Sequence, residues 1–314
     1  MNMREPLVSI CIPTYNRCDY LERSLISLIS QEDFLNGNVE IVISDNASDD
    51  NTQKMVEKLA AIYDNLRFFR NKENIGGDEN PKLVTGLGQG KLLKLCNDDL
   101  IYEDSALKLF CHYAEKYSEE KPQLYFANGI PSGNSFNGFR RVNFEYFMYS
   151  ASYWVTWACT FSIWKTDLDK YYGNNIGIEK KCWQVGPCFD VLDEKDNGVI
   201  IGDCFATRAK LENKNLTYDM YQVFYVNFLS MLEPFREKGK ISQSCMEWIR
   251  HDLLLNFFPY WVAAQELGVE GFKFYHKPLK IDVVRECETK TYYDIYLRNY
   301  NRMLDELQSE CNRI

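Results

Sequence analysis

Two adjacent carboxylates stand where an apolar run ends, which makes Asp98 and Asp99 the first residues in this sequence with an evident chemical use. Carboxylates placed side by side repel each other unless a cation or solvent lies between them. Their hard oxygens suit Mg²⁺ or Mn²⁺, and proteins usually hold such ions with one or two carboxylates while the phosphates of a ligand complete the shell. The pair therefore predicts a metal ion and a diphosphate ligand. A bare Asp-Asp pair is more often a solvated helix cap, so the interpretation depends on its surroundings.

Three more polar segments follow apolar runs in the same way. They are residues 13–17, with the sequence Pro-Thr-Tyr-Asn-Arg, residues 45–50 and residues 74–80. In an open parallel sheet, ligands bind outside the carboxyl ends of the strands, so all four segments are expected to converge on one rim. Singly they have simpler interpretations, since Asp45 could cap a helix and the two glycines of the third segment could form a tight turn. Together they favour a ligand site.

Repeated strand and helix patterns position these segments. Apolar runs typical of buried strands alternate with segments whose apolar residues recur at helical spacing. This alternation predicts an α/β fold with a mostly parallel, Rossmann-like sheet and flanking helices. The expected strands are residues 7–12, 39–44, 66–69 and 91–95, and the expected helices begin near residues 19, 50, 82 and 104.

The second half of the chain is less regular. Residues 128–149 are rich in Gly, Asn, Ser and aromatics and predict a long loop or a small hairpin. Residues 155–164 predict a strand, residues 183–192 predict a helix, and the remainder has mostly helical patterns. We therefore expect a sheet domain over residues 1–215 and a helical C-terminal appendage over residues 216–314.

The composition excludes several classes of protein. Among 314 residues, 36 are basic and 45 acidic, and the net charge of −9 argues against nucleic acid as a partner. The eleven cysteines include no CxxC pair and are accompanied by three histidines, which predicts reduced thiols and no zinc site. No secretion signal or segment long enough to cross a bilayer is visible, which predicts a cytoplasmic protein.

Two common nucleotide-binding motifs do not fit. Residues 86–91, Gly-Leu-Gly-Gln-Gly-Lys, lack the Ser or Thr that follows the lysine of a P-loop, and they precede a strand where a P-loop opens a helix. No GxGxxG follows the first expected strand. The chemistry is therefore expected from carboxylates.

The four polar segments, with their flanking residues, resemble the motifs of the family 2 glycosyltransferases of GT-A fold. The resemblance covers residues 7–115, continues more weakly to about residue 210, and is strongest to the abequosyltransferase-type branch of bacterial surface-polysaccharide assembly. It implies transfer of a sugar, with inversion, from a nucleotide-diphosphate sugar to a hydroxyl of a capsule or lipopolysaccharide glycan, with Mn²⁺ or Mg²⁺. The segments that carry it are residues 8–17, 44–52, 74–77 and 97–99.

The resemblance implies roles for the matching residues. Asp98 falls on the second acidic position of the family's metal-binding DxD motif, with Asp99 beside it, and both are expected to be metal ligands. Cys96 takes the first acidic position, which leaves the motif's usual ribose contact open. Asp45 is expected to hydrogen-bond the base, whereas Arg17 is interpreted as a surface residue. The residues expected to bind the nucleotide are Pro13, Thr14, Tyr15, Asn16, Asp45, Asn74, Gly76, Gly77, Asn97 and Asp98.

The family also supplies a carboxylate base before a later helix, and here Trp183 and Gln184 occupy its place. Gln184 thus stands at the catalytic position without an ionisable group. Glu179, five residues earlier, and Asp190, six residues later, are the possible substitutes. Asp190 is preferred because its side chain could share a helix face with Gln184 or Pro187, and an ordinary surface role for it stays open.

Aromatic residues make up 15% of the chain, and some are expected on the acceptor side. Trp157 and Trp183 are the expected sugar platforms, since the face of an indole ring can stack on a sugar. A core position is equally compatible with Trp183. The aromatic face of the C-terminal region, with Trp248 and Trp261, is expected first to pack on the sheet domain. Homo-oligomer formation and peripheral contact with the inner face of the cytoplasmic membrane, beside a lipid-linked acceptor, stay open.

Two other functions would use the same residues. A non-catalytic nucleotide-sugar-binding or scaffolding protein with a degenerate GT-A domain would account for Cys96 and Gln184. A nucleotidyltransferase would need a Gly-rich, basic loop after the first strand, which residues 13–16 do not provide. The glycosyltransferase is therefore favoured, with the scaffold as its alternative.

Overall fold

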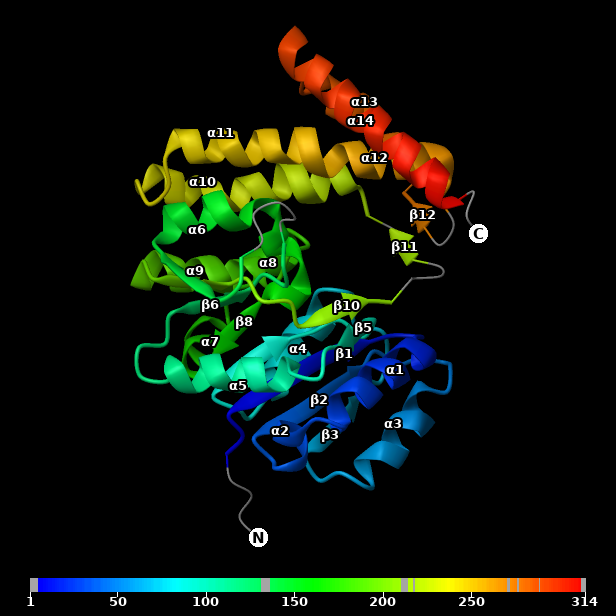
Figure 1. Ribbon diagram of the computed structural model, residues 1–314, viewed down its shortest axis with the longest axis vertical. Helices are drawn as coiled ribbons and strands as arrows, with labels where there is room; N and C mark the ends of the chain where they lie inside the picture. Colours follow the sequence, from blue (N-terminus) through cyan, green and yellow to red (C-terminus); the bar gives the residue numbers. More distant parts are fainter. Residues whose placement is uncertain are drawn as a thin grey trace. The chain divides into compact units, whose positions relative to one another are not determined.

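A computed structural model describes residues 5–130, 136–209, 214–216, 218–269, 272–275, 277–287 and 289–311. The chain divides into two compact units (Figure 1). The N-terminal unit comprises Met1–Phe147 and Trp154–Ala209, and the C-terminal unit comprises Met148–Tyr153 and Lys210–Ile314. The boundary expected after residue 215 thus lies after Ala209, and a six-residue segment before Trp154 belongs to the C-terminal unit.

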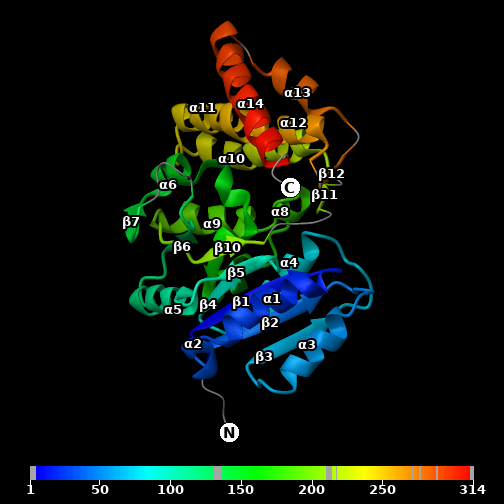
Figure 2. The ribbon, with the colours of Figure 1, turned by 45° about the vertical axis from the view of Figure 1, so that its right-hand side comes forward.

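A five-stranded sheet with the order β3-β2-β1-β4-β8 forms the centre of the N-terminal unit (Figure 2). Its first four strands are parallel to their neighbours, whereas β8 is antiparallel to β4. The mostly parallel α/β sheet expected from the sequence is therefore confirmed. The strands are β1 (Val8–Thr14), β2 (Val39–Asp45), β3 (Leu66–Arg70), β4 (Leu92–Leu95) and β8 (Ser162–Trp164).

Helices follow the first four strands, as their amphipathic spacing predicts. Leu21, Leu25 and Leu28 repeat at helical intervals, and all three are buried with alternate residues of β1 in one core cluster. Helix α4 packs against β1, β2 and β4, with Val84 buried. The helices are α1 (Cys18–Ile29), α2 (Glu32–Leu35), α3 (Thr52–Ala60), α4 (Glu79–Leu87) and α5 (Ala106–Lys116).

Two smaller β structures complete the N-terminal unit. Strands β6 (Gln123–Phe126) and β7 (Phe139–Val142) flank β9 (Gly198–Ile201) in a three-stranded sheet. Strand β10 (Ala206–Arg208) pairs antiparallel with β5 (Leu100–Tyr102), and this register sets Arg208 opposite the residue that follows Asp99. This two-stranded pair thus brings the guanidinium of Arg208 close to the acidic segment.

Two expectations for the middle of the chain are wrong in part. Residues 128–149 contain β7 and most of helix α6 (Phe144–Ala151), besides residues 131–135, which lie outside the described part. In residues 155–164, only β8 is a strand, and two 3₁₀ segments precede it, η1 (Ser152–Thr156) and η2 (Ala158–Thr160). A short apolar run does not by itself distinguish a strand from a buried helical turn.

Three short helices lead to the end of the N-terminal unit. They are α7 (Lys165–Tyr171), α8 (Ile176–Glu179) and α9 (Val185–Lys195). Helix α9 confirms the helix expected near residues 183–192. Its N-cap residue is Gln184.

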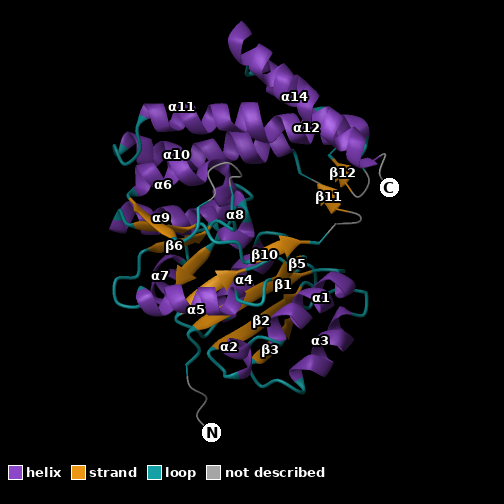
Figure 3. Cartoon of the chain, viewed as in Figure 1, coloured by secondary structure: helices purple, strands orange, loops and turns teal. Residues whose placement is uncertain are grey.

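The C-terminal unit is mostly helical, as expected (Figure 3). The sequence patterns missed one feature, a two-stranded parallel sheet of β11 (Lys214–Leu216) and β12 (Phe272–Phe274). None of the described helices combines the length and the apolar character that crossing a bilayer requires. The helical segments are η3 (Gln222–Asn227), α10 (Phe228–Glu237), α11 (Gln243–Asp252), η4 (Leu253–Phe257), α12 (Phe258–Leu267), α13 (Leu279–Arg285) and α14 (Lys290–Cys311).

Candidate functional site

The four polar segments meet at the carboxyl ends of the parallel strands, as expected. The Thr14 hydroxyl, at the end of β1, donates to Asp98 Oδ2 at 2.9 Å. The backbone N–H of Asn16 donates to Ser48 Oγ at 2.8 Å, and Asn16 Oδ1 accepts from the N–H of Asp49 at 2.7 Å. These bonds tie the first segment to the second and the fourth, so residues 84 positions apart in sequence share one rim.

Asn46 joins the second segment to the third. Its Nδ2 donates to Asn74 Oδ1 at 2.8 Å and to the Gly76 carbonyl at 3.2 Å, while its Oδ1 accepts from the N–H of Ile75 at 2.9 Å. Gly76 has φ of +104°, a conformation that favours glycine over any residue with a side chain. The amide of Asn46 was not among the residues expected to shape the site, although its type and place between Asp45 and Ala47 could have indicated a loop-ordering role.

Asp45 is fully buried at the end of β2. Its Oδ1 accepts from the backbone N–H of Ser48 at 3.0 Å and from the Ser48 hydroxyl, and its Oδ2 pairs with Arg70 at the end of β3. Both carboxylate oxygens therefore hold the loop. The hydrogen bond to a base that the resemblance implies would go to Oδ2, which holds Arg70 and can accept a further hydrogen bond.

The acidic pair is enclosed by two cations from distant parts of the chain. Arg17 Nη1 lies 3.0 Å from Asp98 Oδ1, and Arg208 Nε lies 2.9 Å from Asp99 Oδ2. Asp98 is 5% exposed and Asp99 is fully buried. Burial raises the pKa of Asp98, while the guanidinium of Arg17 opposes that rise and the neighbouring Asp99 adds to it. The positive charges of the two arginines thus nearly balance the negative charges of the two carboxylates.

The interpretation of Arg17 as a surface residue is wrong. Its side chain is 28% exposed, and its guanidinium is bound to the acidic pair. Its place in the same polar segment as Thr14 was a signal that could have found it. Arg208 carries no such signal, because only the pairing of β10 with β5 brings it near Asp99.

The residues present fit a divalent ion that brings further ligands with it. Asp98 Oδ1 and Asp99 Oδ2 face the same point, where Arg17 Nη1 lies 3.0 and 3.9 Å from them. Asp99 Oδ1 is buried and has no hydrogen-bond partner. Among the described residues there is no cluster of three or more His, Cys, Asp or Glu able to hold a metal, so donor phosphates and water would have to complete the shell.

Cys96, at the first position of the acidic motif, is 1% exposed just after β4. Burial raises the pKa of its thiol, which therefore stays protonated and is no substitute for a carboxylate ligand. None of the ten cysteines whose side chains are described forms a disulfide bond.

The acceptor residues expected from the sequence lie in different environments. Trp183 is 1% exposed, and its ring packs edge-on against Phe161 at 5.7 Å, so no face of it is open to a sugar. Trp183 is therefore a core residue and not a platform for a sugar. Trp157 is half-buried and lies edge-on to Trp154 at 6.3 Å. Gln184 is 8% exposed, and its Nε2 donates to the Thr156 carbonyl at 2.6 Å.

Two carboxylates are candidates for the base, one expected from the sequence and one not. Asp190, on α9, accepts a hydrogen bond from Asn174 Nδ2 at 2.7 Å. Asp78, the N-cap residue of α4, accepts one from the backbone N–H of Trp183 at 3.3 Å, and burial raises the pKa of Asp78. Asp78 was missed because it belongs to the third polar segment, 105 residues away from Trp183.

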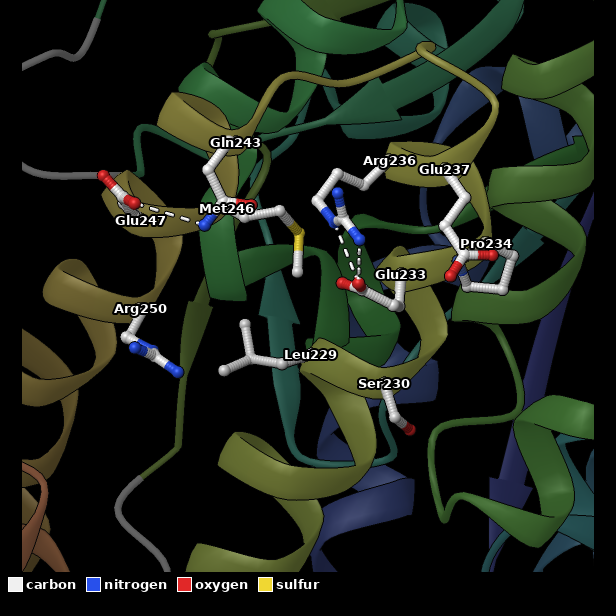
Figure 4. A pocket seen from close by; sticks show the side chains of 10 residues that line it. All are labelled: Leu229, Ser230, Glu233, Pro234, Arg236, Glu237, Gln243, Met246, Glu247 and Arg250. Atoms are coloured by element: carbon white, nitrogen blue, oxygen red, sulfur yellow. Dashed lines mark hydrogen bonds and ion pairs between the residues drawn. The ribbon is translucent and has the colours of Figure 1, made fainter.

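A separate groove of about 750 Å³ lies between α10 and α11 in the C-terminal unit (Figure 4). Acidic and basic side chains line it in similar numbers, and some pair with each other, as Glu233 does with Arg236. None of the residues expected to form the site contributes to it. The lining residues are Leu229, Ser230, Glu233, Pro234, Arg236, Glu237, Gln243, Met246, Glu247 and Arg250.

The stretch of sequence that contains the four polar segments also matches known proteins. Residues 9–161 match the model of the family described as Glycosyl transferase family 2. The abequosyltransferase RfbV of Salmonella typhimurium is 36% identical over 129 residues, which are 40% of this chain and 37% of the relative. The GalNAc(5)-diNAcBac-PP-undecaprenol beta-1,3-glucosyltransferase of Campylobacter jejuni is 33% identical over 99 residues, 30% of each chain. The chain thus matches about a third of the length of these relatives.

Solved structures show the same fold at low sequence identity. TarS residues 1–349 of S. aureus, in complex with UDP-GlcNAc, superimpose with a TM-score of 0.61 at 16% identity, over 96% of this chain and 92% of that one. The mannosyltransferase PcManGT of Pyrobaculum calidifontis, in complex with GDP-Man and Mn²⁺, gives 0.54 at 12% identity, over 98% and 87%. Residues 9–161 are thus a domain of the glycosyltransferase family 2 type, and the solved structures show that the chain has a GT-A fold.

Proposed function

We propose that this protein transfers a sugar, with inversion, from a nucleotide-diphosphate sugar to a hydroxyl group of a bacterial surface glycan. The observation that carries the proposal is the convergence of Thr14, Arg17 and Asp98 at the rim, where hydrogen bonds join two polar segments around a buried acidic pair. Such a rim is where open α/β sheets bind their ligands.

The nucleoside part of the donor would lie against the first three segments. Tyr15 is 42% exposed, so its ring offers an open apolar face to a base. Asp45 orders the loop beneath it, and Gly76, at positive φ, lets the backbone approach the ligand closely. The residues assigned to the nucleotide are Pro13, Thr14, Tyr15, Asn16, Asp45, Asn74, Gly76, Gly77, Asn97 and Asp98.

Asp98 and Asp99 would hold Mn²⁺ or Mg²⁺ together with the donor's diphosphate. When bound, such an ion supplies the positive charge that stabilises a leaving nucleoside diphosphate. Thr14 orients Asp98 by donating a hydrogen bond to Asp98 Oδ2, and Arg208 holds Asp99 by donating one to Asp99 Oδ2. The chain thereby fixes both carboxylates before the ligand arrives, which spares their reorganisation during transfer.

The transfer step forms one bond and breaks another at the anomeric carbon. The acceptor oxygen bonds to that carbon from the side opposite the leaving group, and the electron pair of the broken carbon–oxygen bond passes to the diphosphate. The hydroxyl proton goes to a carboxylate. Asp190 is the base proposed from the sequence, and Asp78 is the carboxylate that lies against Trp183, immediately before Gln184.

The names of the relatives support a surface glycan as acceptor. One relative is an abequosyltransferase, and another acts on an undecaprenol-linked glycan. Trp157 is the proposed sugar platform, because of the two expected tryptophans it is the one that is only partly buried. We place the reaction at the inner face of the cytoplasmic membrane, where a lipid-linked acceptor would be presented.

Thermal shift measurements test the donor site. We expect one of UDP, CDP, GDP and dTDP to raise the melting temperature in the presence of Mn²⁺, and EDTA or Asp98→Ala to abolish the rise. Asp104→Ala is the matched control, since Asp104 is exposed six residues further along and should leave the shift intact. The metal-diphosphate site would be contradicted if no nucleotide raised the melting temperature. It would also be contradicted if the rise were the same without Mn²⁺ and in Asp98→Ala.

The same protein can be tested for catalysis. Hydrolysis of the matching nucleotide sugar, measured as release of nucleoside diphosphate, is expected for a transferase without its acceptor. Tight nucleotide binding with neither hydrolysis nor transfer would instead support a nucleotide-sugar-binding or scaffolding protein.

A further inference from the structure

We propose that Arg17 competes with the divalent ion for Asp98 and Asp99, and that its guanidinium passes to the donor's diphosphate when the ion binds. This inference rests on the proposed function. It makes Arg17 a positioning residue that couples metal binding to donor binding.

The first support is the position of the guanidinium. Arg17 Nη1 lies 3.0 Å from Asp98 Oδ1 and 3.9 Å from Asp99 Oδ2, so it occupies the one point that faces both carboxylates. The other oxygen of Asp98 is bound by Thr14. An ion bound to both aspartates would need Asp98 Oδ1, the oxygen that Arg17 holds, together with an oxygen of Asp99, whose Oδ1 has no hydrogen-bond partner. Two cations at Asp98 Oδ1 would repel each other strongly in a partly buried site.

The second support is the difference between the two arginines. Arg208 binds Asp99, which is fully buried, and it lies in a strand paired to the residues that follow the acidic segment. Arg17 is bound through one nitrogen to Asp98, which is at the exposed edge of the pair. Both arginines bind through one nitrogen, and the Arg208 side chain is 37% exposed against 28% for Arg17, so the difference lies in the backbone and in the carboxylate that each one holds. Arg208 is fixed in a paired strand against the fully buried Asp99, whereas Arg17 precedes α1 and holds the less buried Asp98. The contact of Arg17 is therefore the one assigned to exchange.

The third support is that the side chain of Arg17 can move while its backbone stays in place. Its carbonyl accepts from the N–H of Leu21 at 3.0 Å, and the N–H of the next residue, Cys18, donates to Asp50 Oδ2 at 3.0 Å. The backbone is thus anchored at the start of α1. A long side chain that is 28% exposed can swing from this anchor toward a ligand on the rim.

A diphosphate is the partner that this guanidinium would take. The planar fork of arginine matches phosphate oxygens with two parallel hydrogen bonds. Donor binding would therefore draw Arg17 off Asp98 and open the carboxylates to the ion. Because such coupling is reciprocal, the ion would raise the affinity for the donor by the same factor.

Manganese binding can be measured without any catalysis, from the EPR signal of free Mn²⁺. We expect Arg17→Gln to raise the affinity for Mn²⁺ about tenfold in the absence of nucleotide. In saturating Mn²⁺ we expect it to lower the affinity for the nucleoside diphosphate that binds best to the wild type. Arg23→Gln is the matched control, because Arg23 is exposed on the same helix and its Nε donates to the carbonyl of Asp19.

Arg17→Lys provides a second variant that keeps the charge beside the acidic pair. Competition by charge predicts that its affinity for Mn²⁺ stays near that of the wild type, while its weaker grip on phosphate reduces the coupling. A rise in Mn²⁺ affinity equal to that of Arg17→Gln would overturn the competition.

The outcomes separate this inference from the proposed function. If Arg17→Gln binds Mn²⁺ like the wild type, while Asp98→Ala abolishes Mn²⁺-dependent nucleotide binding, the competition is wrong and the donor site stands. If neither the wild type nor Arg17→Gln binds Mn²⁺, with or without a nucleoside diphosphate, both proposals fail.

Discussion

The carboxylate of Asp78 accepts a hydrogen bond from the backbone N–H of Trp183 at 3.3 Å and so joins the start of α4 to the start of α9. A second contact supports the junction, since Lys82 Nζ donates to Asn175 Oδ1 at 2.6 Å. The third polar segment, residues 74–80, is thus in direct contact with the residues that precede α9. Burial raises the pKa of Asp78, a change that suits a group taking up a proton near neutral pH.

Two isosteric variants test which carboxylate is the base. Asp78→Asn keeps an oxygen for the Trp183 N–H, and Asp190→Asn keeps one for Asn174, so each removes the charge and preserves the contact. We expect Asp78→Asn to lower kcat by about 100-fold or more, with the nucleotide-induced thermal shift unchanged, because loss of a general base removes a factor of roughly 10²–10⁴. Asp190→Asn should stay within a few-fold of the wild type. If Asp190→Asn lowered kcat far more than Asp78→Asn, Asp190 would be the base.

Asp45 should matter first for stability. Asp45→Asn replaces a fully buried carboxylate and leaves Arg70 without its ionic partner. We expect the free energy of unfolding in urea to fall by about 2 kcal/mol, since a buried charged hydrogen bond is lost. Asp49→Asn, on the exposed side of the same loop, should change it by less than about 0.5 kcal/mol. Equal effects of the two substitutions would show that the buried contact contributes nothing.

Replacing the two tryptophans expected at the acceptor site should have different effects, one on stability and the other on acceptor binding. Trp183→Ala empties a buried site beside Phe161 and should lower the free energy of unfolding by about 3–5 kcal/mol. Trp157→Ala should raise the KM for the glycan acceptor while the affinity for the nucleotide stays the same. If acceptor KM is unchanged in Trp157→Ala, the platform must lie elsewhere on the rim.

Lys94 brings a positive charge into the core of the N-terminal unit. Its side chain is fully buried, and Nζ donates to the carbonyl oxygens of Leu95, Cys159 and Phe161. Nζ also lies 5.2–5.6 Å from three aromatic ring centroids. Burial lowers the pKa of Lys94, because the interior disfavours the charged ammonium.

This lowered pKa predicts a pH-dependent stability. Between the folded pKa and the unfolded value near 10.4, the unfolded chain binds more protons than the folded one, so stability rises with pH in that window. Below the folded pKa, the full penalty of the buried charge remains. We therefore expect the unfolding free energy of Lys94→Met minus that of the wild type to decrease as pH rises through this window, with a slope of at most about 1.4 kcal/mol per pH unit.

Urea unfolding of the two proteins at several pH values between 7 and 10.5 measures this difference. Three nearby thiols, those of Cys11, Cys96 and Cys159, have pKa values raised by burial and also affect stability in this range. They are present in both proteins, but the charge of Lys94 lowers the pKa values of Cys96 and Cys159, so the difference reports Lys94 together with its coupling to these thiols. A difference that does not vary with pH would show that Lys94 keeps its ordinary pKa.

The periodicity of the chain was enough to predict the sheet and the helices of the first half. Residues 7–12 and 39–44 are mostly apolar, interrupted by Ser9, Glu40 and Ser44, and the leucines of α1 recur at helical spacing. Both patterns reflect burial, which residues close in sequence are enough to indicate. Residues 155–164 were misjudged for the opposite reason. Their 3₁₀ turns depend on local hydrogen bonds such as that from the N–H of Thr160 to the Trp157 carbonyl, which no hydrophobic pattern encodes.

The sequence by itself determined the family, the order of the four polar segments and the acidic pair, because these depend on residues next to one another. Only the tertiary structure decided what surrounds Asp98 and Asp99. Arg17 is 81 residues from Asp98, and Arg208 is 109 residues from Asp99. Burial in the core likewise decided that Trp183 presents no ring face. Contacts over such distances arise from strand pairing and helix packing, which bring together side chains that no local spacing relates.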